Sequence, residues 1–591
     1  MIRKLARYIR GSTWFFLLAA PVSMVGEVLC DLMQPTLMAN IIDVGVASGD
    51  MAVMFSTGFS MIAMALLGAL FGAGCTVLSS IGAMRFGAAL RKGVFDHIQT
   101  FSFAEIDRFQ TPSLITRLTN DITQIQGILR MGTTILVRAP LLAIGGIIMA
   151  VTLSRKLSII FVIAVPLLFA VAAVIIPRAF SMFSKMQQKI DRVNAVMREN
   201  LLGVRVVKAF VGQEREKARF QEANEDLTAW SLKAMNTVVI AFPLVTLVMN
   251  LSIVALLLYG GRLAMDGALE VGKIMAFMTY LLQVLMSLMM AAMLMVNLSR
   301  AKVSGDRVAE VLDAQTGIQS PTQPRQAQGL SLEFDRVSFR YAYEEADALP
   351  KSAEANDEYV LKDISFRVEA GETIGVIGGT GSGKSTLLSL IPRLYDVDEG
   401  AVRIGGIDVR EMDLDDLRRR VGVVLQESLL FSGTVEENLR WGNAQAGAAH
   451  LQRAMADAQA YDFVSQMPDG IAAHVEQRGR NFSGGQKQRL SIARTFVKEP
   501  DILILDDATS AVDLATEARI QAALKAREGR GMVFVIAQRI SAIAEADRIL
   551  VMDGGRITGI GTHAELLRDN EVYRTIAVSQ LGEEVLAHAG A

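Results

Sequence analysis

The chain has 591 residues, of which 51% are hydrophobic, and its mean hydropathy is +0.35. This composition is too apolar for an ordinary soluble protein, and the 59 basic and 61 acidic side chains nearly cancel, which excludes a polyelectrolyte that binds nucleic acid. The two cysteines, Cys30 and Cys75, lie in apolar runs, where buried thiols are expected and a disulfide framework is not.

Six apolar segments in the first 300 residues are long enough to cross a bilayer, which takes about 20 helical residues. They cover residues 14–41, 54–84, 131–154, 157–177, 234–260 and 273–298. The first follows a basic segment without a small-residue cleavage site, so we expect a retained anchor and not a signal peptide. The six spans predict a transmembrane domain over residues 1–312, followed by a linker at 313–329.

Basic side chains gather on one side of these spans. The N-terminus and the two long segments between spans two and three and between spans four and five are rich in Lys and Arg, whereas the loop "IDVGVASGD" has none. By the positive-inside rule, the N-terminus, both long segments and the C-terminal half are cytoplasmic. We therefore expect a multi-pass protein of the bacterial inner (plasma) membrane, whose spans continue into the cytoplasm as long helical rods.

The second half of the chain alternates β-type and helical runs, which predicts an α/β nucleotide-binding domain over residues 330–591. Its run "GGTGSGKS" follows an apolar strand at 373–377 and precedes a helix, so its backbone N–H groups and the helix N-terminus can hold phosphates. Lys384 is expected to reach the β- and γ-phosphates of ATP, and Ser385 to ligate Mg²⁺. The predicted cradle consists of Gly378, Gly379, Thr380, Gly381, Ser382, Gly383, Lys384, Ser385 and Thr386.

Three further motifs carry groups for nucleotide chemistry. Asp506 ends the apolar run "ILILD" and is expected to hold Mg²⁺ through water, and Gln426 opens a polar loop after a strand and is a candidate for the metal and the catalytic water. The run "FSGGQ" opens a helix and forms a second phosphate grip, made of Ser483, Gly484, Gly485 and Gln486. Two such domains facing head to tail can close both grips on one nucleotide, which a single domain cannot easily do.

The order of these motifs resembles the ATP-binding cassette (ABC) proteins, and with the six spans nearly the whole chain is similar to an exporter-type half-transporter. The resemblance implies an α-helical six-span transmembrane domain followed by an α/β P-loop domain with a RecA-like core and a helical subdomain. It also implies ATP and Mg²⁺ as cofactors, and a second half-transporter in the lipid bilayer as partner.

On that template Tyr341 stacks on adenine, and residues 510–513 communicate across the dimer. The runs "TPSLITRLTND" and "LLGVRVVKAFVGQE" resemble the two coupling segments that touch the cassettes. An acidic insert at 342–358 follows Tyr341, and its Tyr343 competes for the adenine position.

Two positions depart from the family's pattern in the same site. Asp507 stands where the family has its catalytic Glu, and a misplacement of about 1 Å can cost on the order of 10²-fold in rate. Gln538 stands where the family has its switch His, and an amide can donate a hydrogen bond but carries no ionisable proton. Two softer departures are Phe482, expected only to pack, and Gln477, where exporters commonly carry Glu. The resemblance therefore implies a site that binds ATP but hydrolyses it poorly.

Polar and methionine side chains in the spans are candidates for the cargo path. Glu27 and Asp31 lie four residues apart near the middle of span one, so they either attract cationic substrates or form a buried hydrogen bond to a neighbouring helix. Gln34 is a weaker candidate on the same span. Span six carries a stripe of flexible thioethers that suits varied ligands or ordinary packing: Met275, Met278, Met286, Met289, Met290, Met293 and Met295.

These observations predict an ABC-type ATPase that exports hydrophobic or amphipathic compounds by alternating access, as the degenerate-site half of a heterodimer. Its "FSGGQ" grip would complete the competent site of a partner chain that carries Glu and His. Three alternatives stay open: a homodimer in which Asp507 hydrolyses slowly, a lipid flippase with the same mechanism and, more remotely, an ATP-binding regulator or gated channel.

Overall fold

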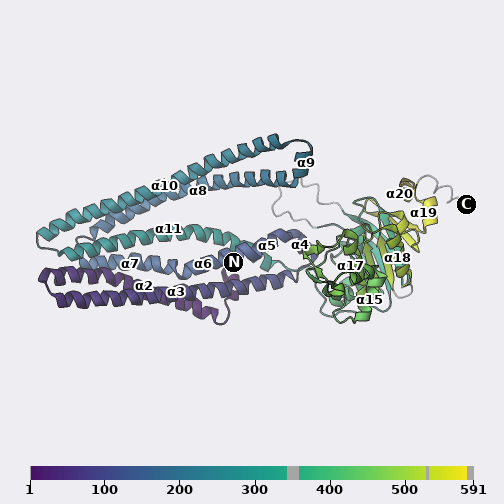
Figure 1. Cartoon of the computed structure of the whole chain (residues 1–591), viewed down its shortest axis with the longest axis horizontal. Helices are drawn as coiled ribbons and strands as arrows, with labels where there is room; N and C mark the ends of the chain where they lie inside the picture. Colours follow the sequence, from purple (N-terminus) through teal and green to yellow (C-terminus); the bar gives the residue numbers. More distant parts are fainter. Residues whose placement is uncertain (1, 342–358, 527–530, 582–591) are drawn as a thin grey trace. The chain divides into compact units, whose positions relative to one another are not determined.

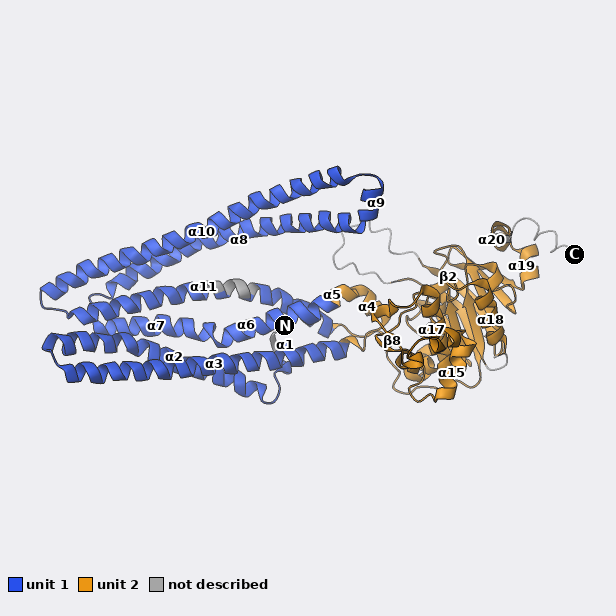
Figure 2. Ribbon diagram, in the orientation of Figure 1, with its two compact units in different colours: residues 1–97, 115–313 blue, residues 98–114, 314–591 orange. Residues whose placement is uncertain are grey.

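A computed structural model describes residues 2–341, 359–526 and 531–581 of the chain (Figure 1). The acidic insert at 342–358 and the competing Tyr343 lie outside the described residues. The chain divides into two compact units, residues 1–97 with 115–313 and residues 98–114 with 314–591 (Figure 2). Residues 98–114 thus belong to the same unit as the C-terminal domain, although transmembrane segments flank them in the sequence.

The first unit is entirely helical in its described residues. Its helices are α1 (Ile2–Leu5), α2 (Thr13–Asn40), α3 (Met51–Ile98), α6 (Ile122–Thr133), α7 (Ile135–Leu153), α8 (Ile159–Leu202), α9 (Val204–Ala209), α10 (Gln213–Met265) and α11 (Val271–Asp313), and α5 (Thr111–Thr116) crosses the boundary between the two units. Short π-helical turns at Ile41–Val46 and Arg117–Asp121 extend α2 and join α5 to α6. Within the described residues, six helical segments are long and apolar enough to cross a membrane, which agrees with the predicted six spans.

Four of these helices are much longer than a bilayer requires. α3, α8, α10 and α11 contain 48, 44, 53 and 43 residues, whereas about 20 suffice for a span. The apolar part of each continues into a polar part without a break, and Figure 1 shows α8 and α10 side by side along their length. These unbroken helices have the length expected of spans that continue as rods, and the extension of the rods into the cytoplasm stays a prediction.

α11 forms the centre of the first unit's core. Phe277, Tyr280, Leu281, Val284 and Leu285 are fully buried on one face of it, at the spacing of a helical stripe. The exposed methionines of the predicted stripe, Met275, Met286 and Met290, lie away from these positions. Packing within this chain therefore does not explain them.

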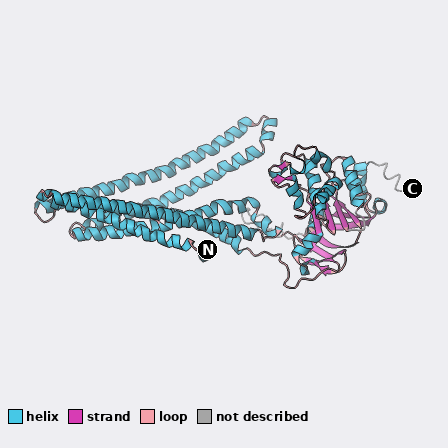
Figure 3. Ribbon diagram, turned by 60° about the horizontal axis from the view of Figure 1, so that its bottom comes forward, coloured by secondary structure: helices cyan, strands magenta, loops and turns pink. Residues whose placement is uncertain are grey.

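The second unit combines two larger sheets and a group of helices (Figure 3). The central sheet has the order β12-β11-β3-β10-β9-β6, in which neighbouring strands pair in parallel except β12 with β11. Its strands are β3 (Thr373–Gly378), β6 (Val421–Val424), β9 (Ile502–Asp506), β10 (Met532–Ile536), β11 (Arg548–Asp553) and β12 (Arg556–Gly561). An antiparallel sheet of order β2-β1-β4-β5 contains β1 (Ser331–Phe339), β2 (Leu361–Glu369), β4 (Glu399–Ile404) and β5 (Ile407–Asp408), and a small ribbon pairs β7 (Gly433–Thr434) with β8 (His474–Val475).

The helices of this unit include one from the N-terminal half, α4 (Phe103–Phe109). The others are α12 (Lys384–Ser389), α13 (Leu414–Arg420), α14 (Val435–Arg440), α15 (Ala448–Asp457), α16 (Tyr461–Ser465), α17 (Gly484–Val497), α18 (Leu514–Lys525), α19 (His563–Asp569) and α20 (Glu571–Leu581). α14 to α17 form the predicted helical subdomain and pack around a core that they share with β6, β9 and α18. The predicted fold class is thus observed in both halves of the chain.

Candidate functional site

The site is built at the carboxyl ends of three neighbouring parallel strands. β3 runs into the glycine-rich loop, β9 ends at Asp506, and β10, which lies between them, is followed by Gln538. Parallel strands end at the same edge of a sheet, so the loop, the two carboxylates and Gln538 converge although they are distant in sequence.

The glycine-rich loop has the backbone that a phosphate cradle needs. Gly381 and Gly383 adopt left-handed φ values of 81° and 94°, which a side chain would strain. A Cβ at Gly378 would lie 2.1 Å from the Met552 carbonyl oxygen, so only glycine fits there. α12 begins directly after the loop, at Lys384, and directs its free N–H groups toward it.

Lys384 lies folded over this cradle. Its ammonium donates to the carbonyl oxygens of Gly378 and Gly379, at 3.0 and 2.8 Å. Burial lowers the pKa of Lys384, and the nearby Asp506 and Asp507 carboxylates oppose that shift. An incoming phosphate can replace the two carbonyl contacts with stronger charge-assisted ones.

The predicted metal ligands Ser385 and Asp506 lie together. The Ser385 hydroxyl donates to the Asp506 carboxylate at 3.1 Å, so both oxygens already face one position beside the cradle. Burial raises the pKa of Asp506, and Asp507 adds to that effect. A hydroxyl and a carboxylate are hard oxygen ligands of the kind that Mg²⁺ prefers, so these residues fit the ion. Gln426 lies exposed in the loop after β6.

The two departures from the family's pattern are in direct contact. The Gln538 amide donates to the Asp507 carboxylate at 3.0 Å. Asp507 itself has a left-handed φ of 50°, held by its N–H bond to the Ile536 carbonyl at 3.0 Å. Burial raises the pKa of Asp507, against the opposing effects of Lys384, Arg539 and the Gln538 bond.

The second phosphate grip lies at the start of α17. The Ser483 hydroxyl and the Gln486 side chain cap this helix reciprocally, at 3.3 and 2.9 Å. Ser483 and Gly484 are exposed, as a grip offered to another chain must be, whereas Phe482 is buried and packs edge-on against Phe463. Gln488, one turn further along, is buried and bonds to Ser510 and Ala511, which ties this helix to the loop after Asp507.

Tyr341 lies beside the phosphate cradle. Its hydroxyl is 2.9 Å from the Thr386 hydroxyl on α12, and its ring packs edge-on against Phe339 and Tyr395. The adenine-stacking role stays a prediction, because the competing Tyr343 lies outside the described residues.

The segment 98–114 contacts the nucleotide-binding domain through Tyr395. The Tyr395 hydroxyl donates to Asp107 at 2.6 Å, and the rings of Tyr395 and Phe103 are 6.1 Å apart. Glu105 accepts a bond from the Gly317 N–H at 3.2 Å. These contacts come from residues just before the predicted coupling run at 111–121, and sequence reasoning did not single them out.

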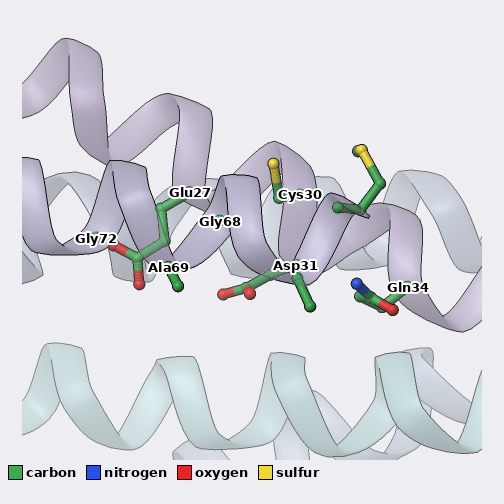
Figure 4. A pocket seen from close by; sticks show the side chains of 9 residues that line it. Glu27, Cys30, Asp31, Gln34, Gly68, Ala69 and Gly72 are labelled. Atoms are coloured by element: carbon green, nitrogen blue, oxygen red, sulfur yellow. The ribbon is translucent and has the colours of Figure 1, made fainter. Parts of the chain in front are cut away.

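In the membrane domain, the carboxylates of Glu27 and Asp31 share one partner that sequence reasoning missed. Arg138 on α7 donates to Glu27 and, at 3.0 Å, to Asp31. Figure 4 shows both carboxylates on the same side of α2, beside a cavity of about 300 Å³ that is also lined by Cys30, Gln34 and residues of α3. The amide of Gln34 donates to the Met61 carbonyl at 3.0 Å. Both cysteines are free and buried, as predicted.

Comparison with known proteins agrees with this architecture. Residues 17–288 match the model of the ABC transporter transmembrane region, and residues 361–510 match that of the ABC transporter domain. An uncharacterized ABC transporter ATP-binding protein of Mycobacterium tuberculosis (strain CDC 1551 / Oshkosh) is 41% identical over 556 residues, which cover 93% of this chain and 94% of the relative. YgaD of Bacillus subtilis, named as a candidate multidrug export ATP-binding/permease protein, is 33% identical over 494 residues, or 83% of each chain.

A solved structure extends the likeness to the whole molecule. The ATP-bound structure of a bacterial Atm1-family ABC exporter has a TM-score of 0.78 and 26% identity, and the match covers 96% of this chain and 99% of that one. The transmembrane region and the ATP-binding domain thus occur in the order of the family. The chain belongs to the ABC transporter family and is an exporter-type half-transporter with an ATPase domain.

Proposed function

We propose that the chain is the degenerate-site half of a heterodimeric exporter of hydrophobic or amphipathic compounds. The observation that carries this proposal is the bond between Gln538 and Asp507. The Asp507 carboxylate is one methylene, about 1.5 Å, shorter than the glutamate it replaces. Its position is held by an amide that can neither accept nor release a proton as a histidine does.

The same chain keeps what a partner's site needs. Ser483 and Gly484 are exposed at the start of a properly capped helix, and Gln488 ties that helix to the loop after Asp507. The chain retains the second phosphate grip and the glycine-rich cradle, but it lacks the catalytic Glu and the switch His. Such a chain is suited to bind ATP in its own site and to support hydrolysis in the site of its partner. Ser385 and Asp506 are the residues that would hold Mg²⁺, and the ion would supply Lewis-acid polarisation of the phosphate oxygens.

Three observations support export of apolar compounds across a bacterial inner membrane. The sixth-span methionines Met275, Met286 and Met290 are exposed in this chain, and thioethers adapt to varied apolar ligands. The relatives reported above come from bacteria, and YgaD is named for multidrug export. Arg138 bonds to both Glu27 and Asp31 and neutralises one of their two negative charges, so neither acid requires a cationic headgroup of the cargo as its partner.

The test is the ATPase activity of the purified chain, alone and with a candidate partner half-transporter that carries the catalytic Glu and the switch His. We expect little turnover from the chain alone and full turnover from the pair, with most of that activity retained in Lys384→Ala of this chain. Asp507→Glu together with Gln538→His should raise turnover of the chain alone by about 10²-fold, the factor that correct placement of the base restores.

The homodimer with slow hydrolysis predicts a different pattern. Substantial turnover by the chain alone, lost in Asp507→Asn and in Lys384→Ala, would overturn the heterodimer proposal. ATP binding by the pair without ATP-dependent flux of any apolar dye or labelled lipid in proteoliposomes would favour a regulator over an exporter.

A further inference from the structure

We infer that Gln580, near the end of α20, is a positioning residue for the nucleotide site and acts through Gln538. Its side-chain amide donates to the Gln538 carbonyl at 2.6 Å. Its side-chain carbonyl accepts from the Ile540 N–H at 2.9 Å. One side chain thereby holds the backbone on both sides of Arg539, in the loop that carries the Gln538 amide.

α20, which carries this pair of Gln580 bonds (the clamp), is packed tightly against the loop. Tyr573 and Ala577 are fully buried in one cluster with Ala537 and Ile540 of the same loop. Residues 573, 577 and 580 follow the i, i+4, i+7 spacing of one helix face, so Gln580 lies on the face that packs against the loop. The Tyr573 hydroxyl also contacts His563 Nδ1 at 2.6 Å, which fixes α20 to α19.

The clamp leads to the reacting end of the site in two steps. Gln580 fixes the backbone of Gln538, and the Gln538 amide donates to Asp507 at 3.0 Å. Asp507 follows Asp506, whose carboxylate bonds to Ser385 at the position expected for the metal. We expect the γ-phosphate to lie at this end of the site, because Gln538 and Asp507 adjoin the residues that would hold the metal, whereas the glycine-rich loop that is expected to hold the β-phosphate is a separate segment. Loss of the clamp should weaken ATP binding and leave ADP binding unchanged.

The experiment uses the full chain in lipid nanodiscs and photolabelling by 8-azido-ATP, read on this chain's own band after electrophoresis and competed by MgATP or MgADP. This readout is specific to the chain, so it has the same meaning in a homodimer and in a heterodimer. We expect Gln580→Ala to weaken competition by ATP about five-fold, the factor for loss of one hydrogen bond of ordinary strength, and to leave competition by ADP unchanged.

Two variants make the assignment specific. Gln580→Glu keeps the acceptor for the Ile540 N–H but loses the donor to Gln538, so it should lose ATP affinity at least as far as Gln580→Ala. Ser579→Ala, at the exposed neighbouring position on the same helix, is the matched control and should behave as wild type.

A double-mutant cycle separates positioning from mere support of the fold. In the Gln538→Ala background, Gln580→Ala should have no further effect on ATP, because the group it positions is gone. Equal loss of ATP and ADP, an undiminished effect in the Gln538→Ala background, or wild-type ATP affinity in Gln580→Glu would each overturn the inference.

Discussion

At the scale of single residues, direct bonds between side chains organise both the altered nucleotide site and the acids of the first span. Asp507 and Gln538 bond to each other, and Glu27 and Asp31 bond to the same arginine. The pairing at Arg138 favours the structural reading of these two acids, because ionisable groups at membrane depth are costly unless they are paired. Substrate contact by Glu27 and Asp31 stays a prediction.

The Arg138 cluster leads to an ordering of stabilities. Arg138→Met leaves two carboxylates without a cation and should be the most destabilising change, at about 3 to 5 kcal/mol. Asp31→Asn should lower the stability least, because the Asp31 side chain is 36% exposed, whereas that of Glu27 is 14% exposed. In this variant Arg138 also keeps its bond to Glu27. Melting temperatures measured by fluorescence-detected size-exclusion chromatography give the order of stability of the variants.

The triple variant Glu27→Gln, Asp31→Asn, Arg138→Met is the control, because it removes all three charges together and should recover most of the loss. If Glu27→Gln kept full thermal stability and yet abolished transport, contact with a cationic cargo would be the better account of these acids.

At the scale of elements, the sequence predicts well what depends on local pattern. The six spans follow from apolar length, and the cradle follows from glycines placed between a strand and a helix. The sequence could not predict that Arg138 pairs with Glu27 and Asp31, because a basic residue near the end of a span is read as a signal of orientation and not as the partner of an acid. Nor could it predict Gln580, whose bonds to a loop about 40 residues earlier depend on the packing of α20 against the central sheet.

The contact of α4 with Tyr395 gives the element-scale prediction. Tyr395 bonds to Asp107 and packs against Tyr341, whose hydroxyl is next to Thr386 at the cradle. Tyr395→Phe removes the hydroxyl and keeps the ring, so nucleotide binding should persist. Stimulation of the ATPase by transported compounds should fall about five-fold, the factor for loss of one hydrogen bond of ordinary strength, because this bond is exposed to solvent.

Wild type and Tyr395→Phe are compared as the reconstituted pair in proteoliposomes. Basal turnover and turnover stimulated by transported compounds are measured separately. Tyr359→Phe is the matched control, because its hydroxyl bonds to Glu399 and not to residues 98–114. Equal loss of basal and stimulated turnover would show that Tyr395 only supports the fold.

At the scale of the whole molecule, the second phosphate grip at Ser483 is intact, whereas the catalytic position at Asp507 is altered. Substitutions in the grip and in this chain's own phosphate cradle should therefore lower the ATPase activity of the pair to different extents. Ser483→Ala removes a hydroxyl from the grip that serves the partner's competent site, whereas Lys384→Ala impairs only this chain's own weak site. A hydrogen bond to a charged phosphate is worth about 1.5 to 3 kcal/mol, so Ser483→Ala should lower turnover of the pair by about 10- to 100-fold. Lys384→Ala should lower it far less.

Ser483 also caps α17, so part of that loss could come from the helix itself. Ser483→Thr separates the two roles, because threonine keeps both a hydroxyl and a capping oxygen and should retain most of the activity. Initial rates of ATP hydrolysis by the reconstituted pair give the three values directly. Equal losses of turnover in Ser483→Ala and Lys384→Ala would mean that the two nucleotide sites contribute equally to ATP hydrolysis. The chain would then form a dimer with two equivalent catalytic sites.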